Sequence, residues 1–119
     1  MMTSVLLVED EPEVRKVIVE AFWEAGLTIA TAANDAIAYK LLEREARSFS
    51  VLVADINLGQ GTTGFDVARR ARQLNPDIKV IYITGQAAHF NRFGVTDGEM
   101  FPKPFSPVDL ADRVQEKLG

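Results

Sequence analysis

Short apolar runs, rich in β-branched residues, alternate along the chain with longer stretches whose apolar positions recur at helical spacing. Such runs predict strands that are buried on both faces, and the intervening stretches predict amphipathic helices. The expected strands are Ser4–Val8, Thr28–Ala32, Phe49–Asp55, Lys79–Gly85 and Glu99–Phe101. Alternating strands and helices form a parallel sheet with helices on both faces, because the crossovers are right-handed. The pattern therefore predicts an α/β fold.

Capping residues and helix breakers bound the expected helices. The first begins at Pro12 and ends at Gly26, the third spans Phe65–Leu74, and the last follows the capping sequence Ser106–Asp109. Residues 87–93 predict a fourth helix that is short or irregular, because glycines interrupt its continuation. The side chains expected in the core are Val14, Val17, Ile18, Ala21, Phe22 and Ala25 of the first helix, Ile37, Leu41 and Leu42 of the second, and Leu110, Ala111, Val114 and Leu118 of the last. Half-buried packing is expected for Trp23.

Composition limits the classes of function. The 119 residues, 47% hydrophobic and 25% charged, fit one domain that spans residues 1–119. A net charge of -4 argues against nucleic acid or an anionic membrane surface as the main partner. The chain has no cysteine, which excludes a disulfide, a thiolate nucleophile and a zinc–thiolate site. The run Val5–Val8 is too short for a membrane span, so we expect a soluble cytoplasmic protein.

Polar residues follow the apolar strands at the point where each strand ends. Glu9 and Asp10 follow the first strand, Asp55 and Thr84 end the third and fourth, and Lys103 comes just after the fifth. The carboxyl ends of parallel strands meet at one edge of the sheet, so these side chains are expected to converge there. Clustered carboxylates repel one another unless a cation joins them, and ligation by oxygen alone favours Mg²⁺ or a similar hard ion. The sequence therefore predicts a metal site at this edge.

Four short motifs resemble the response-regulator receiver domain of two-component signalling. They are VEDE after the first strand, ADIN after the third, YITG after the fourth and PKPF after the fifth, in the family's order and spacing. The resemblance covers nearly the whole chain. It implies the flavodoxin-like (CheY-like) doubly wound sheet with strand order 2-1-3-4-5. It also implies a cis-proline turn after Lys103.

The resemblance assigns a role to each polar residue at the edge. Asp55 is expected to be the phosphoacceptor, and Thr84 and Lys103 are expected to contact the phosphoryl group. The expected magnesium ligands are the carboxylates of Glu9, Asp10 and Asp55 and the backbone carbonyl of Asn57. The family takes its phosphoryl group from a phosphohistidine, so the expected partners are a sensor histidine kinase, a histidine phosphotransfer protein, or both.

The resemblance further implies output by protein contact, with self-phosphorylation and self-dephosphorylation in place of ordinary turnover. An alternative is a receiver-like interaction module that has lost phosphorylation. Such modules usually lack the acceptor aspartate or the lysine, and this chain has both. The chain departs from the family pattern in three places. The loop after Asp55 is one residue longer than usual, and Met100 stands where an aromatic residue is common. The stretch from Thr84 to Lys103 is also short, and this favours a monomer.

Overall fold

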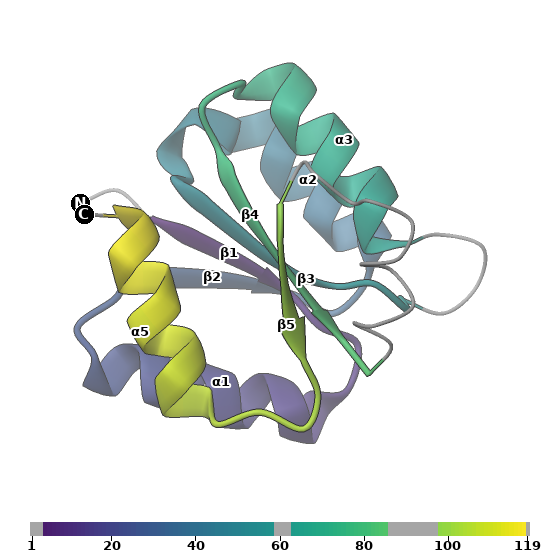
Figure 1. Ribbon diagram of the computed structural model, residues 1–119. Helices are drawn as coiled ribbons and strands as arrows, with labels where there is room; N and C mark the ends of the chain where they lie inside the picture. The colour runs from purple at the N-terminus through teal and green to yellow at the C-terminus, as the bar shows by residue number, and fades with distance from the viewer. Residues whose placement is uncertain (1–3, 59–62, 86–97, 119) are drawn as a thin grey trace.

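A single parallel sheet organises the molecule, and the computed structural model describes residues 4–58, 63–85 and 98–118 of it. The strands are β1 (Val5–Val8), β2 (Ile29–Ala32), β3 (Val51–Asp55), β4 (Lys79–Thr84) and β5 (Glu99–Pro102). They lie in the order β2-β1-β3-β4-β5, and every neighbouring pair is parallel (Figure 1). The predicted fold class and strand order are therefore confirmed.

Helices cover both faces of this sheet, as Figure 1 shows. The helices are α1 (Pro12–Glu24), α2 (Asp35–Glu45), the short 3₁₀ helix η1 (Ala46–Ser48), α3 (Gly64–Leu74) and α5 (Pro107–Leu118). Helices α1 and α5 pack on one face, and α2 and α3 pack on the other. The expected helix over residues 87–93 lies outside the described residues. No helix in the described parts of the chain has the length and apolar character needed to cross a membrane.

Strand β1 shows why the core strands read as unbroken apolar runs. Val5 and Leu7 lie in the cluster beneath α1 and α5, whereas Leu6 and Val8 lie in the cluster beneath α2 and α3. All four are fully buried. Because successive side chains point to opposite faces, a strand covered on both faces must be apolar at every position. The sheet thus has two cores, and its polar groups are left to the strand ends.

Three apolar side chains depart from the sequence prediction. Val17 and Ile37 are 48% and 40% exposed, and Trp23 is 69% exposed rather than half-buried. In α1 the fully buried side chains are Ile18 and Phe22. The helix therefore presents a narrower stripe to the core than its apolar spacing predicts. A periodic pattern gives the direction of a side chain but does not tell whether another element covers it.

Candidate functional site

Three polar residues at the carboxyl edge of the sheet are almost completely buried, whereas Asp10 and Glu11 beside them are exposed. The exposed fractions are 0% for Glu9, 4% for Asp55 and 1% for Thr84. Asp55 and Thr84 are the last residues of β3 and β4, and Glu9 comes directly after β1. Buried polar side chains at a sheet edge need partners, because desolvation without a hydrogen bond is costly. As predicted from the sequence, the three residues lie at the same end of the parallel sheet.

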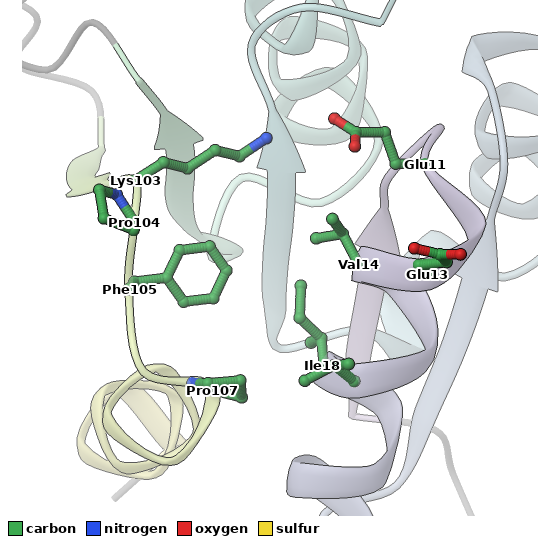
Figure 2. Close-up of a pocket in the computed structure, with 9 residues that line it drawn as sticks. Glu11, Glu13, Val14, Ile18, Lys103, Pro104, Phe105 and Pro107 are labelled. Carbon is green, nitrogen blue, oxygen red and sulfur yellow. The ribbon is translucent and has the colours of Figure 1, made fainter.

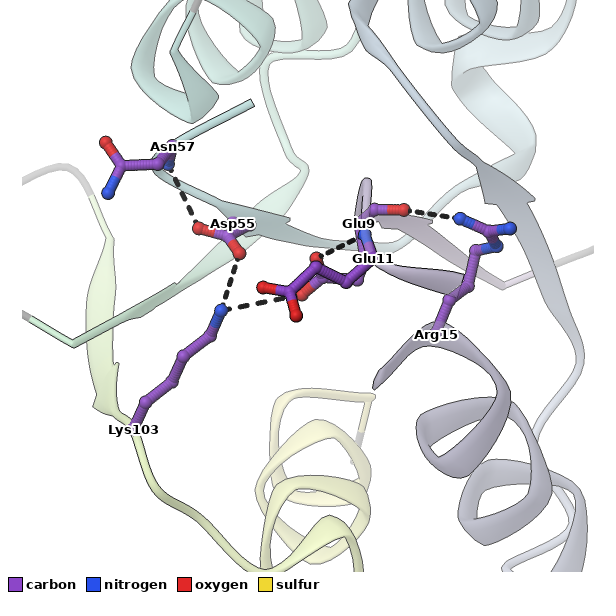
Figure 3. A network of polar contacts seen from close by, with 6 residues as sticks. All are labelled: Glu9, Glu11, Arg15, Asp55, Asn57 and Lys103. Carbon is purple, nitrogen blue, oxygen red and sulfur yellow. Dashed lines mark hydrogen bonds and ion pairs between the residues drawn. The ribbon is translucent and has the colours of Figure 1, made fainter. Parts of the chain in front are cut away.

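Lys103 reaches the carboxylates from the segment that follows β5. Its Nζ lies 2.7 Å from Asp55 Oδ2 and 3.8 Å from Glu9 Oε1 (Figure 3). Its backbone N–H donates to the Thr84 carbonyl at 2.8 Å, which ties this segment to the end of β4. The peptide bond between Lys103 and Pro104 is cis, as the sequence resemblance implies. The hydrogen bond to Thr84 therefore holds Lys103 next to the end of β4, from where its ammonium reaches Asp55.

Asp55 is fixed in place by the residues that follow it. Its Oδ1 accepts from the backbone N–H of Asn57 at 3.0 Å, and Asn57 in turn forms an isolated antiparallel bridge with Thr63. Gly64, the first residue of α3, packs so closely that a Cβ there would lie 2.5 Å from the Asp55 carbonyl oxygen. Any larger residue at this position would push α3 away from β3. The sequence analysis missed this role of Gly64, although a glycine at a helix start offered a signal.

Four carboxylates gather closely enough to share a cation. Glu9, Asp10, Glu11 and Asp55 each offer an oxygen, and these oxygens lie within 4.8 Å of one another. Within the described residues, Glu9 Oε1 is buried and accepts no hydrogen bond. Divalent magnesium prefers oxygen ligands, so this donor set and the unsatisfied oxygen fit such an ion. Glu11 was not among the predicted ligands, although it extends the run of acids that the sequence shows.

The charges of the cluster alter the ionisation of two of its members. Burial, together with the nearby Asp55 carboxylate, raises the pKa of Glu9 to about 8, against the lowering effects of the Glu11 backbone N–H and Lys103. Burial acts to lower the pKa of Lys103, but the hydrogen bond to Asp55 and the charges of Asp55 and Glu9 raise it. Without a metal ion, Glu9 therefore holds a proton at neutral pH while Lys103 stays charged.

A groove adjoins this site along α1. Its apolar lining comes from Val14, Val17 and Ile18 of α1 and from Pro104, Phe105 and Pro107 across the gap (Figure 2). Its volume is about 560 Å³, and Glu11, Glu13 and Lys103 also line it. We call it the α1 groove. The groove borders the carboxylate cluster, because Glu11 belongs to both and Lys103, which lines the groove, contacts Asp55.

Met100 lies away from the cluster, on the side of α2 and α3. It is half-buried against that core and pairs in register with Tyr82 of β4. The Tyr82 ring is fully buried and contacts the Phe65 ring, with centroids 4.8 Å apart. The aromatic pair on this side thus comes from β4 and α3, while Met100 packs against the same core from β5.

Known proteins resemble the chain over nearly its whole length. A profile of the response regulator receiver domain matches residues 5–115. The response regulator receiver protein CpdR of Brucella abortus is 34% identical over 98% of both chains. The sensor kinase CckA of the same organism is 36% identical over 97% of this chain, which spans 12% of the kinase.

Solved structures agree with these sequence matches. A response regulator receiver protein from Sinorhizobium medicae superposes with a TM-score of 0.86 at 28% identity, covering 98% of this chain and 94% of that one. The response regulator TrrA of Thermotoga maritima, solved in complex with Mg²⁺ and BeF, gives 0.80 at 28% identity, covering 98% and 99%.

Proposed function

The chain belongs to the response regulator receiver domain family, whose members accept a phosphoryl group in two-component signalling, and we propose that Asp55 is its phosphoacceptor. One observation carries the assignment. Asp55 is a nearly buried carboxylate whose Oδ2 lies 2.7 Å from the Lys103 ammonium, at the sheet edge where the acidic cluster lies. A carboxylate at such a position can act as a nucleophile if the charge of the incoming group is neutralised.

The residues proposed to hold Mg²⁺ are the carboxylates of Glu9, Asp10 and Asp55 and the backbone carbonyl of Asn57. The unsatisfied Glu9 Oε1 supports this assignment, as does the Mg²⁺ complex of the similar TrrA receiver. When bound, the ion supplies positive charge against the oxygens of the transferring group. Because Glu9 holds a proton at neutral pH in the metal-free site, metal binding must release that proton.

The proposed transfer is an in-line displacement at phosphorus. One Asp55 carboxylate oxygen forms a bond to the phosphorus of a donor phosphohistidine, the nitrogen–phosphorus bond breaks, and the imidazole nitrogen keeps the electron pair. Lys103 stabilises negative charge on one phosphoryl oxygen as a compact point charge. The Thr84 hydroxyl contacts the product acyl phosphate. Attack of water on the same phosphorus returns the carboxylate, which accounts for self-dephosphorylation.

The proposed donors are a sensor histidine kinase or a histidine phosphotransfer protein, and the proposed output is protein contact by a monomer. We propose that the donor docks in the α1 groove, because a segment of the donor placed there would end beside Lys103. Its apolar lining suits one face of an amphipathic helix. Glu11 and Glu13 favour basic residues beside that face. A cytoplasmic location, compatible with the absence of cysteine, is part of the proposal.

Beryllium fluoride, a mimic of the phosphoryl group, tests the assignment without a donor protein. With Mg²⁺ present it should raise the melting temperature of the wild type, because it binds the folded state only. The melting temperature of Asp55→Asn, and of the wild type after chelation of Mg²⁺, should not change on addition of beryllium fluoride. In size-exclusion chromatography each sample should elute as a monomer. The alternative function, an interaction module without phosphorylation, predicts no shift in any sample. A shift that persists in Asp55→Asn would place the acceptor elsewhere.

A further inference from the structure

Arg15 is not one of the proposed acceptor or ligand residues, yet it forms hydrogen bonds to the turn that carries Glu9 and Asp10. We call Glu9–Glu11, between β1 and α1, the acidic turn. The guanidinium Nη1 of Arg15 donates to the backbone carbonyl of Glu9 at 2.8 Å, and the Arg15 backbone N–H donates to the carbonyl of Glu11 at 2.9 Å. One residue of α1 therefore contacts both ends of the acidic turn.

Lys103 and Arg15 approach the acidic turn from different sides. Figure 3 shows Lys103 on the side of Asp55 and the Arg15 guanidinium on the other side, at the Glu9 carbonyl. The turn has two further ties, from Glu9 N–H to the Ala32 carbonyl and from Glu11 N–H to Glu9 Oε2, each at 3.1 Å. Repulsion among the carboxylates acts to open a turn of this kind. The bond from Arg15 opposes that opening on the side that Lys103 does not reach.

We propose that Arg15 is a positioning residue, which holds the acidic turn so that the Glu9 and Asp10 carboxylates face Asp55 and thereby sets the affinity of the site for a divalent cation. The inference rests on the proposed magnesium site. Arginine suits the task because its guanidinium is always charged and directs its donors in a fixed plane. A hydrogen bond from a charged donor is also stronger than a neutral one.

The expected effect follows from the place of Arg15 behind the ligands. Loss of a residue that orients metal ligands typically weakens metal binding by about 10- to 100-fold. Arg15→Met keeps the length of the side chain and removes its donors. We expect it to weaken Mg²⁺ binding about tenfold, measured by calorimetric titration at constant ionic strength. Arg15→Lys, which retains a charged donor, should recover most of the affinity.

Lys16→Met is the matched control, since it removes the same charge from the next residue, which is exposed. It should change the affinity less than about twofold, because an exposed charge is screened by solvent and salt. A second readout needs no metal: in the metal-free protein, the Glu11 amide should exchange its hydrogen faster in Arg15→Met than in Lys16→Met.

The outcomes separate this inference from the proposed function. If the wild type binds Mg²⁺ and becomes phosphorylated while Arg15→Met binds equally well, Arg15 has no positioning role and the function stands. Equal losses in Arg15→Met and Lys16→Met would point to a general disturbance of α1 rather than to the bond with Glu9, because loss of a positive charge alone should not weaken cation binding, and would overturn the inference. A wild type that binds no Mg²⁺ contradicts the proposed metal site, and the inference about its affinity falls with it.

Discussion

The faces of the sheet and the inner residues of its carboxyl edge, Glu9 and Asp55, are both buried but differ in what burial does. Along β3, the residues from Val51 to Ala54 are completely buried in two apolar cores, and the next residue, Asp55, is only 4% exposed. On the faces, burial removes apolar surface from water and stabilises the fold. At the edge it desolvates carboxylates, and the raised pKa of Glu9 records the cost. A fold keeps such an edge only if the crowded groups have a use.

Truncating the core should have the largest effect on stability and leave the chemistry alone. Leu52 is fully buried in the cluster beneath α2 and α3. Leu52→Ala removes apolar contacts and leaves a cavity, so we expect it to cost about 2–5 kcal/mol of unfolding free energy, measured by urea denaturation. Phosphorylation by acetyl phosphate, expressed per folded molecule, should stay close to that of the wild type. A loss of reactivity among the folded molecules would show that packing on the face of the sheet also controls the chemistry at its carboxyl edge.

Changing Lys103 should have the opposite effect. Lys103→Met removes the ammonium that faces Asp55 Oδ2, and we expect phosphorylation by acetyl phosphate to slow by about 100-fold, the usual cost of one charge-stabilising donor. Mg²⁺ binding should persist, because in our assignment the lysine meets phosphoryl oxygen and not metal. Rates from intact mass and affinities from calorimetry check both points. Loss of Mg²⁺ binding would contradict the separation of these roles.

The pH dependence of the metal-free protein should report the burial of Glu9. Its pKa is about 8 in the fold, against 4.5 for a glutamate in water, so between these pH values the folded state holds a proton that the unfolded state has released. Stability from this group is therefore present at low pH and decreases as the pH rises towards 8, by at most about 1.4 kcal/mol per pH unit.

Urea titrations of the wild type and Glu9→Gln, with chelator present, measure this slope. The glutamine variant cannot ionise, so its stability should decrease less over the same pH range. Parallel slopes for the two proteins would mean that Glu9 is not the buried, proton-holding group of the edge.

The smallest expected effect concerns the α1 groove. Val17 is exposed and lines the groove, so Val17→Glu should slow phosphotransfer from a protein donor about tenfold, because it removes an apolar contact and places a charge against the apolar face of the donor. Reaction with acetyl phosphate, which needs no docking surface, should not change. Ile37→Glu is the matched control, because Ile37 is similarly exposed but lies on α2, outside the groove. Equal losses in both variants would remove the groove from the docking surface.

The sequence predicted the sheet better than the surroundings of the site. Strand β1 was predictable because burial on both faces requires four apolar residues in succession. The approach of Lys103 to Asp55, across 48 residues of sequence, followed from the rule that parallel strands end together. Val17 and Ile37 were misplaced because helical spacing does not reveal which neighbour covers a side chain.

The roles of Arg15 and Gly64 escaped prediction for a different reason. Both residues act on backbone atoms, the carbonyl of Glu9 and the carbonyl of Asp55. A contact with the backbone places no requirement on the type of the residue it touches, so Glu9 and Asp55 give no sign of these contacts, and the glycine at the start of α3 was the signal that the sequence did offer. Such contacts can be recognised only from the three-dimensional structure of the turn and of the helix start. The acids of the proposed magnesium site, by contrast, were visible in the sequence at the ends of strands.

Intact mass after incubation with acetyl phosphate and Mg²⁺ tests the central claim most directly. The wild type should gain a single adduct of roughly 80 Da, the mass of one phosphoryl group. Asp55→Asn should gain none, and neither should the wild type after chelation of the metal. An adduct that survives in Asp55→Asn, or that forms equally well without Mg²⁺, would contradict the assignment of Asp55 as the metal-dependent phosphoacceptor.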